Sequence, residues 1–171
     1  MATDPYQLYP VIAQIAAAFA GFGSIASGLG RRRGGDDARI DAHRLTTMLV
    51  ASLSATLLGL LPATLSAFSL NERWALGASS IVALVVIIAY APAATARALK
   101  IRHVAGFSRA ANIANLGCVL IAVGAFSLCA LGLPADQLAA LYLVGLMGLL
   151  GSSVVMFSRV IASMLRPHNE A

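Results

Sequence analysis

The chain has 171 residues, of which 59% are hydrophobic and only 11% are charged, and its formal net charge is +5. A soluble domain carries about 25% charged residues, because its surface needs charge to stay dispersed in water. The composition therefore excludes an ordinary soluble domain, and with it a soluble nucleic-acid-binding protein. It predicts a membrane protein in which the cations are divided between the two sides of a bilayer.

Five apolar segments are long enough to cross the hydrocarbon core, which is about 30 Å thick and needs about 20 helical residues. Each segment is expected to be a helix, because lipid offers backbone groups no hydrogen-bond partner. A β-barrel would show alternating apolar and polar residues, and the segments show no such alternation. The predicted fold class is an all-α helical bundle, a single transmembrane domain over residues 1–171 with spans at about 8–29, 45–70, 74–99, 110–133 and 137–165.

The first span is followed by the most charged stretch of the chain, RRRGGDDARIDAHR at residues 31–44. Eleven of the twelve Lys and Arg residues fall on one side of an alternating five-span path, and Arg73 alone falls on the other. The positive-inside rule assigns the basic side to the cytoplasm. We expect residues 31–44 to form the first cytoplasmic loop, with the N-terminus outside and the C-terminus inside. The predicted location is a bacterial inner membrane, with anionic headgroups against the basic loops.

The same stretch contains side chains that are able to bind a metal, namely Asp36, Asp37, Asp41 and His43. Their spacing matches no diagnostic metal motif. We therefore expect a solvated loop here and no metal or cofactor.

The second span carries a stripe of small and hydroxyl side chains with Pro62 inside the helix. Proline removes a backbone donor and leaves a carbonyl without its partner, which is tolerated at membrane depth where protein or water covers it. Two interpretations remain open: a hydroxyl-lined pore, or a groove that packs against another helix. The stripe comprises Ser52, Thr56, Gly59, Ala63 and Ser66.

The last two spans add polar residues near their cytoplasmic ends. Asn112 and Asn115 lie one turn apart on one helical face, and their amides are expected to turn inward, either to bond another helix or to line a solute path. Arg159 lies close to the end of the fifth span. It either extends to the headgroups or contributes to a ring of arginines at a pore mouth.

No Asp, Glu, Lys or His lies in the middle of any span, which argues against an ion-coupled transporter. No nucleophile is paired with a base, so we do not expect an enzyme.

The functional prediction is a homo-oligomeric channel for a small ion, with anions slightly favoured by the basic mouths, or for a small solute. The alternative is a non-catalytic accessory subunit that assembles with a larger membrane complex. The predicted pore-lining residues are Ser52, Thr56, Gly59, Ser66, Asn112, Asn115 and Arg159.

Overall fold

The computed structural model describes residues 5–30, 36–101, 103 and 108–164. These residues form five helices: α1 (Pro5–Gly30), α2 (Asp36–Ala67), α3 (Glu72–Ile101), α4 (Arg109–Leu131) and α5 (Leu138–Met164). Each helix contains a stretch that is long and apolar enough to cross a membrane. The prediction of an all-helical, multi-pass membrane protein is thereby confirmed. Residues 31–35 of the basic stretch, as well as Arg102 and Arg166, lie outside the described residues.

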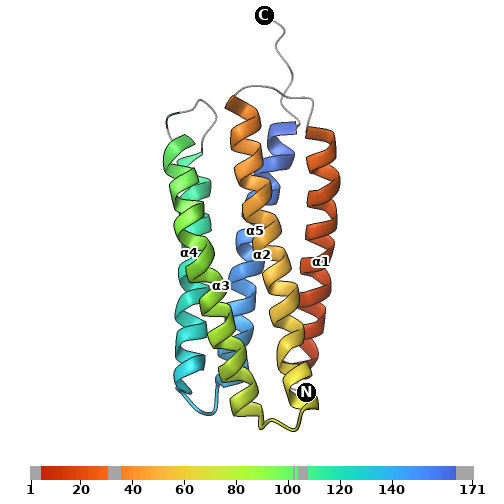
Figure 1. Ribbon diagram of the computed structural model, residues 1–171, viewed down its shortest axis with the longest axis vertical. Coiled ribbons are helices and arrows are strands. Elements are labelled where there is room, and N and C mark those ends of the chain that lie inside the picture. Colours follow the sequence, from red (N-terminus) through yellow and green to blue (C-terminus); the bar gives the residue numbers. More distant parts are fainter. Residues whose placement is uncertain (1–4, 31–35, 102, 104–107, 165–171) are drawn as a thin grey trace, which may run out of the picture.

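The helices run alternately up and down, so that α1, α3 and α5 end where α2 and α4 begin (Figure 1). We call this end of the molecule the basic end, because the described cations of α2 to α5 gather there, with the exception of Arg73 at the opposite end. The assignment of the basic end to the cytoplasm stays a prediction. The cations at the basic end are Arg39, Arg44, Arg97, Lys100, Arg109 and Arg159.

The bounds of α2 differ from the prediction at both ends. The helix begins at Asp36, so residues 36–44 are helical and do not form a loop. The buried side chain of Ile40 and an ion pair between Arg44 and Asp41 at 3.2 Å support this early start. The helix ends at Ala67, three residues before the predicted end, because the chain turns at Ser69, whose φ is 62°.

Helices α2, α3, α4 and α5 form a four-helix bundle, and α1 packs on its outside against α2 and α5. Two close contacts depend on glycine. A Cβ added at Gly59 of α2 would lie 2.9 Å from the carbonyl oxygen of Tyr9 on α1. A Cβ at Gly148 of α5 would lie 2.8 Å from the carbonyl oxygen of Cys118 on α4. Such close backbone approach is how helices associate in lipid, where the hydrophobic effect does not drive them together.

Candidate functional site

A cavity of about 580 Å³ lies inside the bundle of α2, α3, α4 and α5. Its lining extends from His43 to Ser54 on α2 and from Arg109 to Val119 on α4. At a rise of 1.5 Å per residue these stretches are about 15 Å long, or about half of a hydrocarbon core. The cavity therefore occupies the half of the bundle nearer the basic end. Its volume falls within the range of about 300–1,000 Å³ that is usual for small-molecule pockets.

The cavity arises from the course of α3 and from small side chains. Helices α2 and α3 lie close together at their short turn and separate towards the basic end (Figure 1). The residues that face one another across the widened space are too small to fill it. Alanines make up much of this wall: Ala51 on α2 and Ala91, Ala94 and Ala98 on α3.

The opposite half of the protein contains a buried aromatic cluster, in which Phe126 and Tyr142 of the bundle meet Tyr9 of α1. The ring of Tyr142 packs edge-on against Tyr9 and Phe126, with centroid distances of 5.3 Å and 5.4 Å. All three side chains are almost fully buried. The hydroxyl of Tyr9 donates to the carbonyl of Ala139 at 2.9 Å, which holds α1 against α5. We call these three residues the aromatic plug, because they close the bundle beyond the cavity.

Polar side chains form a band at the middle depth of the cavity. The hydroxyls of Thr47 on α2 and Tyr90 on α3 lie 3.4 Å apart and share a hydrogen bond. Ser152 on α5 donates to the side-chain oxygen of Asn115 on α4 at 2.5 Å. The band thus joins the four helices in pairs, α2 with α3 and α4 with α5, and Asn112 lies on the same wall.

His43 is the most unusual member of the lining. Its side chain is 8% exposed, and its Nδ1 atom has no hydrogen-bond partner among the described residues. It also borders a smaller void of about 20 Å³, together with Ser108 and Asn112. Most buried polar atoms in proteins have a partner, and Nδ1 of His43 is the exception among the described residues that line the cavity.

The mouth of the cavity is electropositive. Exposed Arg109 and His103 line it, and no acidic residue is among its described lining residues. The guanidinium of Arg97 lies 5.7 Å above the ring of Tyr90, close to the same opening. The mouth is therefore suited to attract anions.

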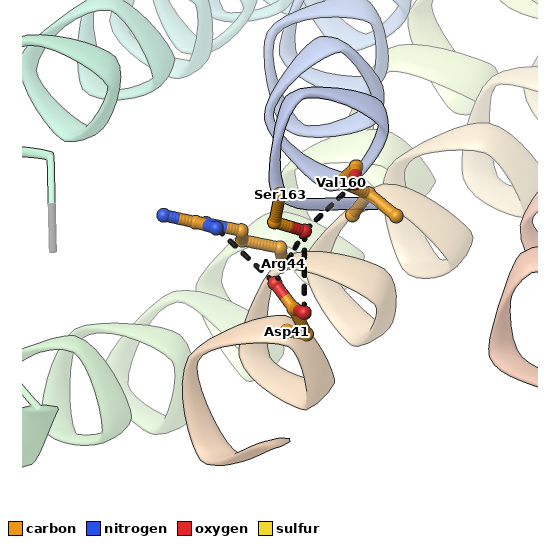
Figure 2. A network of polar contacts seen from close by, with 4 residues as sticks. All are labelled: Asp41, Arg44, Val160 and Ser163. Atoms are coloured by element: carbon orange, nitrogen blue, oxygen red, sulfur yellow. Dashed lines mark hydrogen bonds and ion pairs between the residues drawn. The ribbon is translucent and has the colours of Figure 1, made fainter. Parts of the chain in front are cut away.

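The nearest carboxylate, Asp41, is engaged elsewhere. It accepts hydrogen bonds from Arg44 at 3.2 Å and from Ser163 of α5 at 3.1 Å, and the Ser163 hydroxyl also reaches the carbonyl of Val160 (Figure 2). This network ties α2 to α5 at the basic end. It holds the Asp41 carboxylate on the α5 side of α2, and Asp41 does not line the cavity.

Two of the seven predicted pore-lining residues, Asn112 and Asn115, line the cavity. They share one wall, as their spacing predicted. Arg159 does not line the cavity, because its guanidinium donates to the hydroxyl oxygen of Ser108, the residue that caps α4, at 2.7 Å.

The other four predicted residues, all on α2, lie outside the cavity. Ser52 is fully buried, and Gly59 packs against α1. Thr56 donates to the carbonyls of Ser52 and of Ala13 on α1, and Ser66, at the exposed end of α2, donates to the carbonyl of Pro62 at 2.9 Å. Within this chain, Thr56 and Gly59 belong to a groove that packs against α1.

Sequence reasoning missed His43, Thr47, Tyr90 and Ser152. A signal for part of this set exists, since His43, Thr47 and Ser54 follow one another at helical spacing and share one face of α2. The signal is hidden in the sequence because the charge of residues 31–44 predicts a loop, which separates His43 from the helix.

Comparison of the chain with protein-family models, with curated proteins and with solved structures finds no match. The chemistry of the cavity is therefore argued from its own side chains. These offer hydrogen-bond donors and positive charge near the mouth, uncharged polar groups at middle depth, and apolar walls.

Proposed function

We propose that this protein binds a small solute in the cavity of the four-helix bundle and that binding is a step in moving the solute across the membrane. The observation that carries the proposal is the position of the cavity. It lies inside a bundle of membrane-spanning helices, and its lining extends from the basic end to about the middle of the helices, at Ser54 on α2 and Val119 on α4. A binding chamber that reaches about half of the bilayer thickness is what a transport path requires in a state that is closed on one side.

The arrangement differs from the predicted channel for a small ion or solute, whose pore is lined mainly by the stripe of α2. A path through the single chain would use the other face of α2, with His43, Thr47 and Ser54, and the facing amides of Asn112 and Asn115. Hydroxyl and amide groups replace part of the hydration shell of a solute without holding it too tightly to leave. The aromatic plug is then the closed gate, and passage requires that Tyr142 and its neighbours move apart.

Self-association is part of this proposal. Ala17, Ala18 and Gly21 form a small-residue face of α1 that is exposed, and a Cβ added at Gly21 would meet no atom within 4 Å. Small faces allow close helix contact in lipid. This face supports packing against a second copy of the chain, and it equally favours the second candidate function, an accessory subunit that contacts another membrane protein.

The test is flux through purified protein in liposomes, measured with labelled chloride, acetate, benzoate and glycerol. We expect wild-type protein to carry at least one of these solutes faster than protein-free liposomes. Ala94→Phe fills the cavity and should abolish the flux. Ala93→Phe is the matched control, because Ala93 is exposed and does not line the cavity. Absence of flux in the wild type, or equal loss in both variants, would contradict the proposal.

A further inference from the structure

We propose that the solute is a small amphipathic anion, with an apolar body and one anionic group, and that His43 binds its anionic end. The inference rests on the proposed solute-binding function and adds the chemical class of the ligand. It is carried by three independent features of the cavity: the order of apolar and polar walls, the unpartnered nitrogen of His43, and the absence of acidic side chains from the described lining.

The walls change from apolar to polar along the depth of the cavity. The deep part is lined mainly by aliphatic side chains. Polar groups follow at middle depth, and the cationic side chains of Arg109 and His103 lie at the mouth, together with the apolar side chain of Leu99. A ligand that fits this order carries its apolar part towards the aromatic plug and its polar part towards the basic end. The deep aliphatic residues are Val50, Val86, Ile87, Val119 and Leu149.

His43 lies between the aliphatic floor and the mouth, next to Asn112, with which it borders the smaller void. A buried nitrogen without a partner is unfavourable, because burial removes its hydrogen bond to water. The residue is more than nine-tenths buried and lines the cavity, and in this proposal a molecule bound there supplies the partner. An imidazole N–H donates to a carboxylate, sulfonate or phosphate oxygen, and the neighbouring Asn112 amide offers a second donor.

The charge of the mouth selects the sign of the ligand. Arg109 and His103 line it, and Asp41 is held on the α5 side by Arg44 and Ser163. A cation would meet positive charge here, and no carboxylate among the described lining residues would neutralise it. An anion gains from the cations and from a low-dielectric wall that strengthens their field.

The test uses benzoate, an amphipathic anion that dissolves in water, and benzamide, its uncharged analogue of the same shape. Binding is measured by equilibrium dialysis of the labelled compounds against protein in phosphatidylcholine nanodiscs. We expect one benzoate per chain, bound at least about tenfold more tightly than benzamide, since hydrogen bonds to charged groups are the stronger ones. Equal affinity for the two compounds would overturn the inference.

His43→Leu should weaken benzoate binding by about tenfold and change benzamide binding by less than about twofold. Arg109→Gln, at an exposed position where folding is not at risk, should weaken benzoate binding at low salt, and the loss should fade as salt screens the charge. Lys100→Gln is the matched control, because Lys100 is exposed at the same end and does not line the cavity. Unchanged benzoate affinity in both His43→Leu and Arg109→Gln would overturn the assignment.

The two proposals fail in different ways. If benzamide binds as well as benzoate and Ala94→Phe blocks both, the solute site stands and the anion inference is wrong. If neither compound nor any solute of the flux panel binds, the proposed function itself is wrong.

The anionic group could belong to a free metabolite-sized molecule or to a lipid headgroup, and a second set of nanodiscs containing phosphatidylglycerol separates these sources. If phosphatidylglycerol lowers benzoate binding to the protein by more than it changes benzoate uptake by protein-free discs, the anionic group belongs to a lipid headgroup. Unchanged benzoate binding identifies a free anion.

Discussion

The hydroxyl of Tyr142 on α5 donates a hydrogen bond of 2.6 Å to the carbonyl oxygen of Leu58 on α2. Leu58 lies four residues before Pro62, and this is the carbonyl that the missing N–H of Pro62 leaves without its helical partner. The side chain that closes the bundle thus also satisfies the defect in α2. Any movement that opens the aromatic plug must either break this bond or carry α2 and α5 together.

This relationship predicts that the effects of Tyr142→Phe and Pro62→Ala on stability are coupled. Tyr142→Phe should lower the free energy of unfolding by about 1 kcal/mol, because it leaves a buried carbonyl unpaired. In a Pro62→Ala background the alanine N–H can bond the same carbonyl, so the loss should be clearly smaller. The double-mutant cycle is measured by denaturation in mixed micelles. An equal loss in both backgrounds would show that the Tyr142 bond is unrelated to Pro62.

The contact between α4 and α5 predicts unequal effects of two glycine substitutions. A Cβ at Gly148 would lie 2.8 Å from a backbone oxygen of α4 and 3.0 Å from the Cβ of Ala122. Gly148→Ala should therefore cost about 1–3 kcal/mol through overpacking.

Gly124→Ala is the matched control, because its added Cβ meets no atom within 4 Å and alanine favours the helix. We expect no loss of thermal stability from this change. A tolerated Gly148→Ala would mean that α4 and α5 do not approach as closely as described.

The cation distribution predicts the orientation of the chain. Cysteines introduced at Gly35, between α1 and α2 in the sequence, and at Ala105, between α3 and α4, should be protected from a membrane-impermeant thiol reagent added outside intact cells. A cysteine at Ala135, between α4 and α5, should react. Labelling of the wild-type protein measures the background reaction of the native cysteines, half-buried Cys118 and buried Cys129. External labelling at Gly35 would reverse the assignment of the basic end to the cytoplasm.

The helices were predictable because their apolar length reflects the thickness of the bilayer, a constraint that acts on each segment separately. The inward orientation of Asn112 and Asn115 followed from the cost of placing amides against lipid. The start of α2 is not predicted correctly because the high charge of residues 31–44 indicates a loop. In the structure two of these charges, Asp41 and Arg44, pair with each other on the helix surface.

The neighbours of each helical face were not predictable. Periodicity identified Ser52, Thr56 and Gly59 as one face, but it contains no information on whether α1 or a cavity lies opposite. The partner of Arg159 is Ser108, which is 51 residues away in the sequence. Such a contact depends on the order in which the helices surround one another.

The central claim is that the cavity is open to the basic end and closed towards the opposite end. It is tested by reacting Ala94→Cys, in a chain without Cys118 and Cys129, with an impermeant anionic methanethiosulfonate added to one side of oriented vesicles at a time. The outward-facing Ala93→Cys is the control and should react slowly from either side. We predict fast reaction of Ala94→Cys from the basic side and protection from the opposite side. Equal reaction from both sides, or none from the basic side, would contradict the account.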